Sequence, residues 1–412
     1  LKWVILFNNT ISMEYNFRRW FVSLTAMICL ALAGFNYAGI DVAYNDIRGN
    51  LGATLNQVSR ITTVYILGTL IIVPFSSWLS SQLGRRNYLG WAVICFTVCS
   101  FFCGNATSLD MLIVYRFLQG MGAGAMLVSS HTILTESWPI EKCATSQLLV
   151  LAGLGLGAAL GNPISGYITD EYSWIVIFFA NIPLGIIACL LVFVFVKNGS
   201  DKKDEDWQAR ILLTVGACCL YVGLERCQYV GELNVPVMIL LLLVGLTGII
   251  LFIWRQYHLL NINLRAGLVL FLFYSFISGI QIVISNSSLN ALTASSYDSF
   301  WVVALIPIVV ILITTALIQR NRKMIRPVII VGMLLLMISL CLCLKDVSFP
   351  AILILSIAEA MLSISILTLA LSELEGKELG RGVAYYYVIG KIGGVLTSLL
   401  YFVIPYLLEM FK

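Results

Sequence analysis

The chain has 412 residues, of which 60% are hydrophobic and only 11% are charged, and its mean hydropathy is +0.94. Soluble domains carry about 25% charged residues, so this composition excludes a soluble globular protein and predicts an all-α protein that crosses a membrane many times. The net charge of +4 reflects arginines and lysines gathered in certain loops and does not indicate nucleic-acid binding.

Apolar stretches long enough to cross a bilayer recur about thirteen times. Six are expected before the most polar run of the chain, residues 197–206. They lie at about residues 20–43, 55–80, 88–105, 111–135, 144–168 and 172–196. A tight pair and five further spans follow, at about residues 211–229 and 235–254, then 267–289, 300–318, 328–344, 349–371 and 383–408.

This order of spans predicts five parts of the chain. They are an N-terminal cytoplasmic segment (1–19), a six-helix bundle (20–196), a mobile cytoplasmic linker (197–209), an extra transmembrane hairpin (210–256) and an incomplete C-terminal bundle (257–412). Arginines and lysines crowd alternate loops, which places the N-terminus and the linker in the cytoplasm. The last span then ends outside, so we expect the natural protein to have one more helix, and Met13 is a plausible start.

The span at about 111–135 contains Arg116, followed by Gln119 and by glycines at 120, 122 and 124. A charge at membrane depth costs roughly 2.5 to 3.5 kcal/mol and usually faces protein or water with a function to perform. The alternative is that Arg116 extends along its helix to the outer interface. The glycines allow neighbouring helices to approach closely.

Two motifs bear a resemblance to the major facilitator superfamily. Gly84, Arg85 and Arg86 match the end of that family's loop signature, although Ser81 replaces its aspartate, and these arginines could equally be positive-inside anchors. Arg116, Gln119 and Gly120 match the family pattern R-x-x-Q-G almost fully.

The next span resembles an antiporter signature of the same family. Gly157, Gly161 and Gly166 match, and Pro163 is displaced by one position. Small residues at this spacing also suit a simple helix contact. Together with residues 174–185 and the extra hairpin, this span resembles the fourteen-span drug/proton antiporters of the EmrB/QacA type.

The first span differs from that branch in the position of its acid. Asn36 occupies the position of the branch's aspartate, and Asp41 occupies the position of its asparagine. The acid has moved about 7.5 Å along the helix axis. Asp41 is either a relocated proton site or an exposed residue at the outer end of the span. Tyr37, like Asn36, is expected to contact substrate.

The second half of the chain matches the branch less well. Glu359 lies in the middle of a span, and either a structural pairing with Lys391 or a coupling role would suit it. His131 is expected to form an interhelical hydrogen bond rather than a proton relay. Cys95, Cys99 and Cys103 share a helical face, but no histidine or carboxylate joins them, so no metal site is predicted.

The fold expected is the major facilitator fold, with two six-helix halves, an inserted helical hairpin and the last helix missing. The resemblance implies a proton-coupled exporter of a small amphipathic or cationic compound in the inner membrane, not an enzyme, and without cofactors. Asp41, Arg116 and Glu359 would couple protons, and Asn36, Tyr37, Gln119 and Lys391 would contact substrate. The resemblance also allows an accessory periplasmic adaptor. Proton-coupled uptake and a degenerate, non-transporting membrane protein or sensor are the two alternatives.

Overall fold

The computed structural model describes residues 2–199, 206–226, 235–256, 262–275, 297–345, 349–376 and 378–393, and these residues are almost entirely helical, with no strand among them. Ten of the described helices are long and apolar enough to cross a membrane, and two shorter apolar helices cover Ile262–Ser275 and Ile306–Arg320. The predicted all-α membrane fold is therefore confirmed. The spans expected at 211–229, 267–289 and 383–408 extend outside the described residues, as do residues 200–205 of the linker expected at 197–209.

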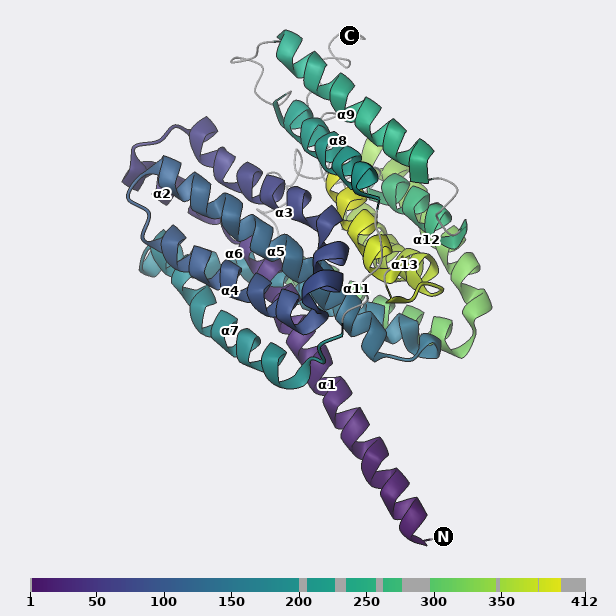
Figure 1. Ribbon diagram of the computed structural model, residues 1–412. Coiled ribbons are helices and arrows are strands. Elements are labelled where there is room, and N and C mark those ends of the chain that lie inside the picture. Colours follow the sequence, from purple (N-terminus) through teal and green to yellow (C-terminus); the bar gives the residue numbers. More distant parts are fainter. Residues whose placement is uncertain are drawn as a thin grey trace. The chain divides into compact units, whose positions relative to one another are not determined.

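The first part of the chain, as far as Phe195, contains seven longer helices, which we call the N-terminal bundle (Figure 1). They are α1 (Lys2–Ala38), α2 (Tyr44–Leu51), α3 (Leu55–Leu83), α4 (Arg85–Gly104), α5 (Leu109–Ser137), α6 (Cys143–Glu171) and α7 (Trp174–Phe195), with the short helices η1 (Asp41–Ala43) and η2 (Ile140–Lys142) between them. Helix α1 begins well before the expected span because no glycine or proline interrupts it before Gly34. The short helix α2 was not predicted from the sequence.

Side-chain caps define where several of these helices begin. Thr54 accepts a hydrogen bond from the backbone N–H of Gln57, whose side chain accepts one from Thr54 N, and this capping box starts α3. Ser108 and Ser173 cap α5 and α7 more simply, because the hydroxyl oxygen of each accepts one backbone N–H of the helix that follows. Each cap satisfies a backbone donor at the point where the chain enters the next helix.

Helix α5 is the centre of the N-terminal bundle. It packs against α1, α3 and α4, while α7 packs against α1 and α4. From Gly122 to Thr135 every residue of α5 is buried, so this helix is enclosed on all sides over that stretch. A polar residue on α5 therefore faces other protein.

The remaining elements are α8 (Trp207–Arg226), α9 (Val235–Gln256), α11 (Tyr297–Arg320), η3 (Arg322–Met324), α12 (Ile325–Lys345) and α13 (Phe349–Leu371), together with helical segments at 262–275 and 378–393. Helices α8 and α9 pack side by side, and α13 packs against α11 and α12 (Figure 1). The chain divides into two compact units, which are Leu1–Pro139, Leu149–Glu205 and Glu375–Ala384 in one, and Ile140–Leu148, Asp206–Leu374 and Tyr385–Lys412 in the other.

Candidate functional site

Arg116 is completely buried in the N-terminal bundle. Its side chain has 0% exposure, so it does not extend to the outer interface, the alternative that the sequence left open. One guanidinium nitrogen, Nη1, donates to Oε1 of Gln119, one helical turn further on, at 2.9 Å. Its Nε and Nη2 are buried and have no hydrogen-bond partner among the described residues. A buried charge with unused donors is costly, and such groups are retained where they have a function.

A polar network connects Arg116 to three other helices. Asn36 on α1 and Asn181 on α7 form a reciprocal amide pair, with donor–acceptor distances of 2.8 and 3.2 Å. Gln119 donates to Oδ1 of Asn36 at 3.3 Å and also to the hydroxyl of Ser100 on α4. All five of these side chains are buried, so α1, α4, α5 and α7 share one hydrogen-bonded centre.

Aromatic rings cover the guanidinium of Arg116. Its central carbon lies 4.4 Å from the ring centroid of Tyr65 on α3 and 5.6 Å from that of Phe178 on α7. A ring face attracts a cation and partly replaces the lost water. Gly120 makes the closer contact possible, because a Cβ there would overlap the backbone carbonyl of Tyr65.

Asp41, the acid proposed for coupling, lies outside this network. It belongs to the short helix η1 after α1 and is exposed. One of its carboxylate oxygens accepts a hydrogen bond from Thr62 at 3.1 Å, and Thr62 accepts one from the hydroxyl of Tyr44 at 2.5 Å. Asp41 is thus linked to α3 through Thr62. Tyr37 is also exposed, whereas Asn36, the vacant position of the branch's acid, is part of the buried centre.

The glycines of α6 lie against α1. A Cβ at Gly157 would overlap the carbonyl of Ala31, and one at Gly161 would press on Phe35 and Ala38. Gly166 has only a side-chain atom of Val42 at contact distance. Pro163 lies inside α6, which continues to Glu171. The matched glycines at 157 and 161 therefore set the close approach of α1 and α6.

The matched loop forms a sharp turn between α3 and α4. Gly84 has φ +84°, a conformation that favours glycine, and a Cβ there would also collide with Asn198. Arg85 forms an ion pair with Glu136 at the end of α5, and its backbone N–H donates to the carbonyl of Gly199 at 3.1 Å. Arg86 is half-buried. The loop therefore links α4, α5 and the start of the linker.

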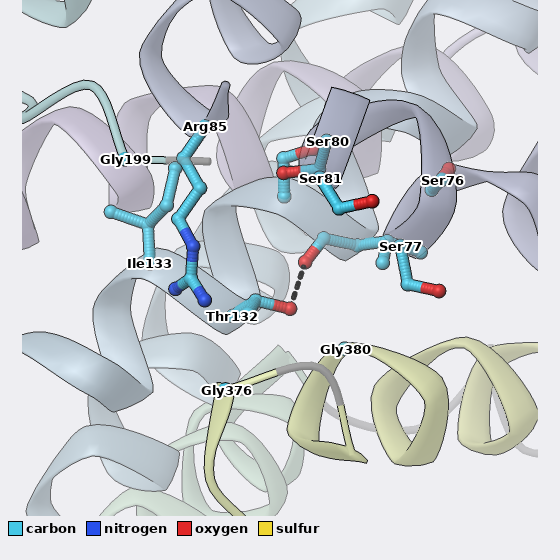
Figure 2. A pocket seen from close by; sticks show the side chains of 12 residues that line it. Ser76, Ser77, Ser80, Ser81, Arg85, Thr132, Ile133, Gly199, Gly376 and Gly380 are labelled. Atoms are coloured by element: carbon cyan, nitrogen blue, oxygen red, sulfur yellow. Dashed lines mark hydrogen bonds between the residues drawn. The ribbon is translucent and has the colours of Figure 1, made fainter. Parts of the chain in front are cut away.

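A cavity of about 30 Å³ lies beside Arg85 (Figure 2). Half of its twelve lining residues carry a hydroxyl group, and these are Ser76, Ser77, Ser80 and Ser81 on α3 and Ser129 and Thr132 on α5. The Thr132 hydroxyl is already used, because it donates to the carbonyl of Val128 at 2.8 Å. A space of this size holds a water molecule and is too small for a drug-sized compound.

The remaining predicted residues are placed but not tested by the structure. Glu359 on α13 and Lys391 are half-buried, and His131 on α5 has 0% exposure. Cys99 and Cys103 are buried and Cys95 is exposed, and Sγ of Cys103 lies 3.8 Å from Oε1 of Gln119. Among the described residues no group of three or more His, Cys, Asp or Glu could hold a metal ion.

The sequence did not identify three participants in these sites. Asn181 and Ser100 belong to the buried network, and Glu136 is the partner of Arg85. Asn181 could have been noticed as an amide within an apolar span. Nothing in the sequence distinguishes Ser100 from other serines of the apolar spans.

Comparison with known families and curated proteins supports these motifs. A family model described as Major Facilitator Superfamily matches residues 26–398. The multidrug export protein EmrB of Escherichia coli K12 is 29% identical over 219 residues, covering 52% of this chain and 43% of that protein. The multidrug resistance protein 3 of Bacillus subtilis is 28% identical over 207 residues, with coverages of 50% and 40%.

The fatty acid resistance protein FarB of Neisseria gonorrhoeae is 30% identical over 189 residues, covering 45% of this chain and 37% of that protein. The chain thus covers less than half the length of each of these relatives. Among solved structures, the human organic anion transporter MFSD10 superposes with a TM-score of 0.66 at 13% identity, covering 93% of this chain and 94% of that one. The proton:xylose symporter XylE superposes with a TM-score of 0.62 at 15% identity, with coverages of 94% and 88%.

Proposed function

Because the chain belongs to the major facilitator superfamily, whose members are multi-pass membrane transporters, we propose that it is a secondary transporter. We propose that it exports a small amphipathic compound. The names of its curated relatives, two multidrug proteins and a fatty acid resistance protein, support export rather than uptake. A guanidinium at the centre of the N-terminal bundle disfavours a cationic substrate by electrostatic repulsion, so we favour a neutral or anionic amphiphile.

The buried Arg116 carries this proposal. The helices around it are held by amide and hydroxyl hydrogen bonds that would remain without the charge. The bond to Gln119 and the two rings offset only part of the cost of burying the guanidinium, because its Nε and Nη2 have no partner in the described structure. We propose that these donors face the substrate or the coupling site when the bundle changes conformation, with Gln119 and Asn36 beside them.

We further propose that export is coupled to protons through a carboxylate outside this network. Asn36 cannot ionise, and Asp41 lies five residues further along the chain in hydrogen-bond contact with α3. Glu359, half-buried in α13, is the second candidate. The protein would lie in the inner membrane with its N-terminus in the cytoplasm, as the distribution of loop arginines and lysines favours.

Transport in reconstituted vesicles tests the function. The wild-type chain should exclude an amphipathic dye and move protons when a transported compound is added, whereas an uptake symporter would accumulate the compound. Arg116→Gln should lower transport at least about tenfold, because one lost charge-assisted interaction is worth about 1.5 to 3 kcal/mol. The matched control is Arg60→Gln, an exposed arginine on α3, which should transport normally.

Two results would overturn the proposal. Transport by Arg116→Gln at the wild-type rate, with the variant folded and inserted, would show that the buried charge has no role. Neither exclusion nor accumulation of any compound tested, with no proton flux, would favour a non-transporting membrane protein.

A further inference from the structure

A second cavity of about 460 Å³ lies at the end of the N-terminal bundle that carries the Arg85 turn. This volume falls in the range of small-ligand sites. Four cationic side chains and a single carboxylate line the cavity, namely Arg18, Arg19, Arg85, Lys197 and Glu136. The transport mechanism proposed above does not use this cavity, which leaves its excess of positive charge to be explained.

Basic side chains outnumber carboxylates in the lining. Its single carboxylate, Glu136, is paired with Arg85. Arg18 is held in place by a hydrogen bond from its Nε to the carbonyl of Phe195 at 3.1 Å. The guanidinium of Arg19 lies 5.4 Å from the ring of Trp138. Two cations are thus fixed in position, and their charge favours an anionic ligand.

The surroundings of the cavity indicate that this anion belongs to a lipid. Trp20 and Trp138 meet edge-on at 5.2 Å beside it, and Trp20 is 56% exposed. Tryptophan gathers at the depth of the lipid headgroups. Val194, one residue before the cavity-lining Phe195, is 67% exposed. A headgroup could therefore enter the cavity while its acyl chains stay on the apolar surface of α1 and α7.

We propose that this cavity binds the phosphate headgroup of an anionic phospholipid from the membrane leaflet on its side. Arginine guanidinium groups match phosphate oxygens, and basic cavities between membrane helices bind such headgroups. The ligand would also contact the start of the linker, because Asn198 and Gly199 form part of the wall and Gly199 accepts a hydrogen bond from Arg85 N. Binding would stabilise the linker against the Arg85 turn.

Lipid binding to the purified full chain tests this site. Native mass spectrometry should show retention of phosphatidylglycerol in preference to phosphatidylcholine with the same acyl chains. Lys197→Gln, an exposed side chain, should weaken retention about fivefold, and Arg18→Gln with Arg19→Gln about thirtyfold, as expected for the loss of one and two surface cations. Arg18→Lys should retain the lipid, because it keeps the charge while losing the bond to Phe195.

Controls distinguish this cavity from general attraction of basic loops to lipid. Arg48→Gln with Arg60→Gln removes two exposed cations from other parts of the bundle and should leave retention unchanged. Loss of retention in that control, or equal retention of both lipids by the wild-type chain, would overturn the proposal. Inorganic phosphate that displaces the lipid completely at millimolar concentration would show that the ligand is a soluble anion instead, which also contradicts a lipid site.

Discussion

Asn36 and Asp41 lie five residues apart in the sequence, but Asn36 is buried and Asp41 is exposed. Asn36 is 2% exposed and uses both ends of its amide, because Nδ2 donates to Asn181 and Oδ1 accepts from Gln119. Asp41 is exposed and accepts from Thr62. An amide suits the buried position, since it both donates and accepts there.

This difference leads to a prediction about proton coupling. Asp41→Asn should abolish proton-driven transport while the protein still folds and inserts, because the first span would then lack an ionisable acid. Glu359→Gln should have a smaller effect. Proton flux in proteoliposomes measures both, and full-rate pumping by Asp41→Asn would transfer the role to Glu359.

A double variant tests whether the position of the acid matters. Asn36→Asp combined with Asp41→Asn should restore part of the coupling, because the new carboxylate would still accept from Gln119 close to the charge of Arg116. It would lose the donation to Asn181, so some loss of stability should accompany it. No recovery in a folded double variant would show that coupling requires the acid at position 41.

At the scale of helices, the contact between α1 and α6 depends on residues without side chains. We predict that Gly157→Val lowers stability by about 1 to 3 kcal/mol, because its side chain would overlap the Ala31 carbonyl. The matched control is Gly155→Val on the same helix, which has no heavy atom within 4 Å of its Cβ position. Thermal unfolding in detergent measures both, and equal shifts would contradict a specific α1–α6 contact.

The pair α8–α9 is joined at one end by Asp206. Its carboxylate accepts from Arg255 at 2.5 Å and Gln256 at 3.3 Å, while the other oxygen accepts from Ala209 N at 3.2 Å and caps α8. The hydrogen bond from Arg255 holds the pKa of Asp206 below its ordinary value. The charged form therefore stabilises the hairpin.

The sign of this pKa shift gives a pH-dependent prediction. A carboxyl whose pKa is lowered by folding adds stability above its ordinary pKa of about 3.9 and loses it as the pH falls through the lower, folded value. Asp206→Asn should keep the cap but lose the ion pair, so it should be less stable than wild type at pH 7, and this difference should shrink as the pH falls below about 3.9. A difference in stability that stays the same from pH 7 down through the acid range would show that the charge is not responsible.

For the whole molecule, the positive loops predict a single orientation. Lys142→Cys should react with an impermeant thiol reagent only from the cytoplasmic side, and Asn50→Cys only from the opposite side, since both positions are exposed. Labelling of the parent chain, which has cysteines of its own, is subtracted. The reverse pattern would invert the topology and place the Arg18–Arg19 cavity in the other leaflet.

The sequence by itself determined most of the membrane helices, because hydropathy and span length are local properties that a bilayer selects directly. It also identified Arg116 and Gln119, whose contact is between neighbours three residues apart on one helix. It missed α2, because a helix of eight mostly polar residues is too short and too polar to be predicted as a membrane span.

Only the tertiary structure decided which side chains share a site. Asn36 meets Asn181 across 145 positions of sequence, and Glu136 reaches Arg85 from another helix. Those contacts depend on how each helix is rotated about its axis and on how closely the helices approach one another. Glycines such as Gly120 permit a close approach, but the spacing of residues in the sequence does not show which helices meet there. For the same reason the cavity lined by Arg18, Arg19 and Arg85 could not be predicted from the sequence, in which these arginines only indicate cytoplasmic loops.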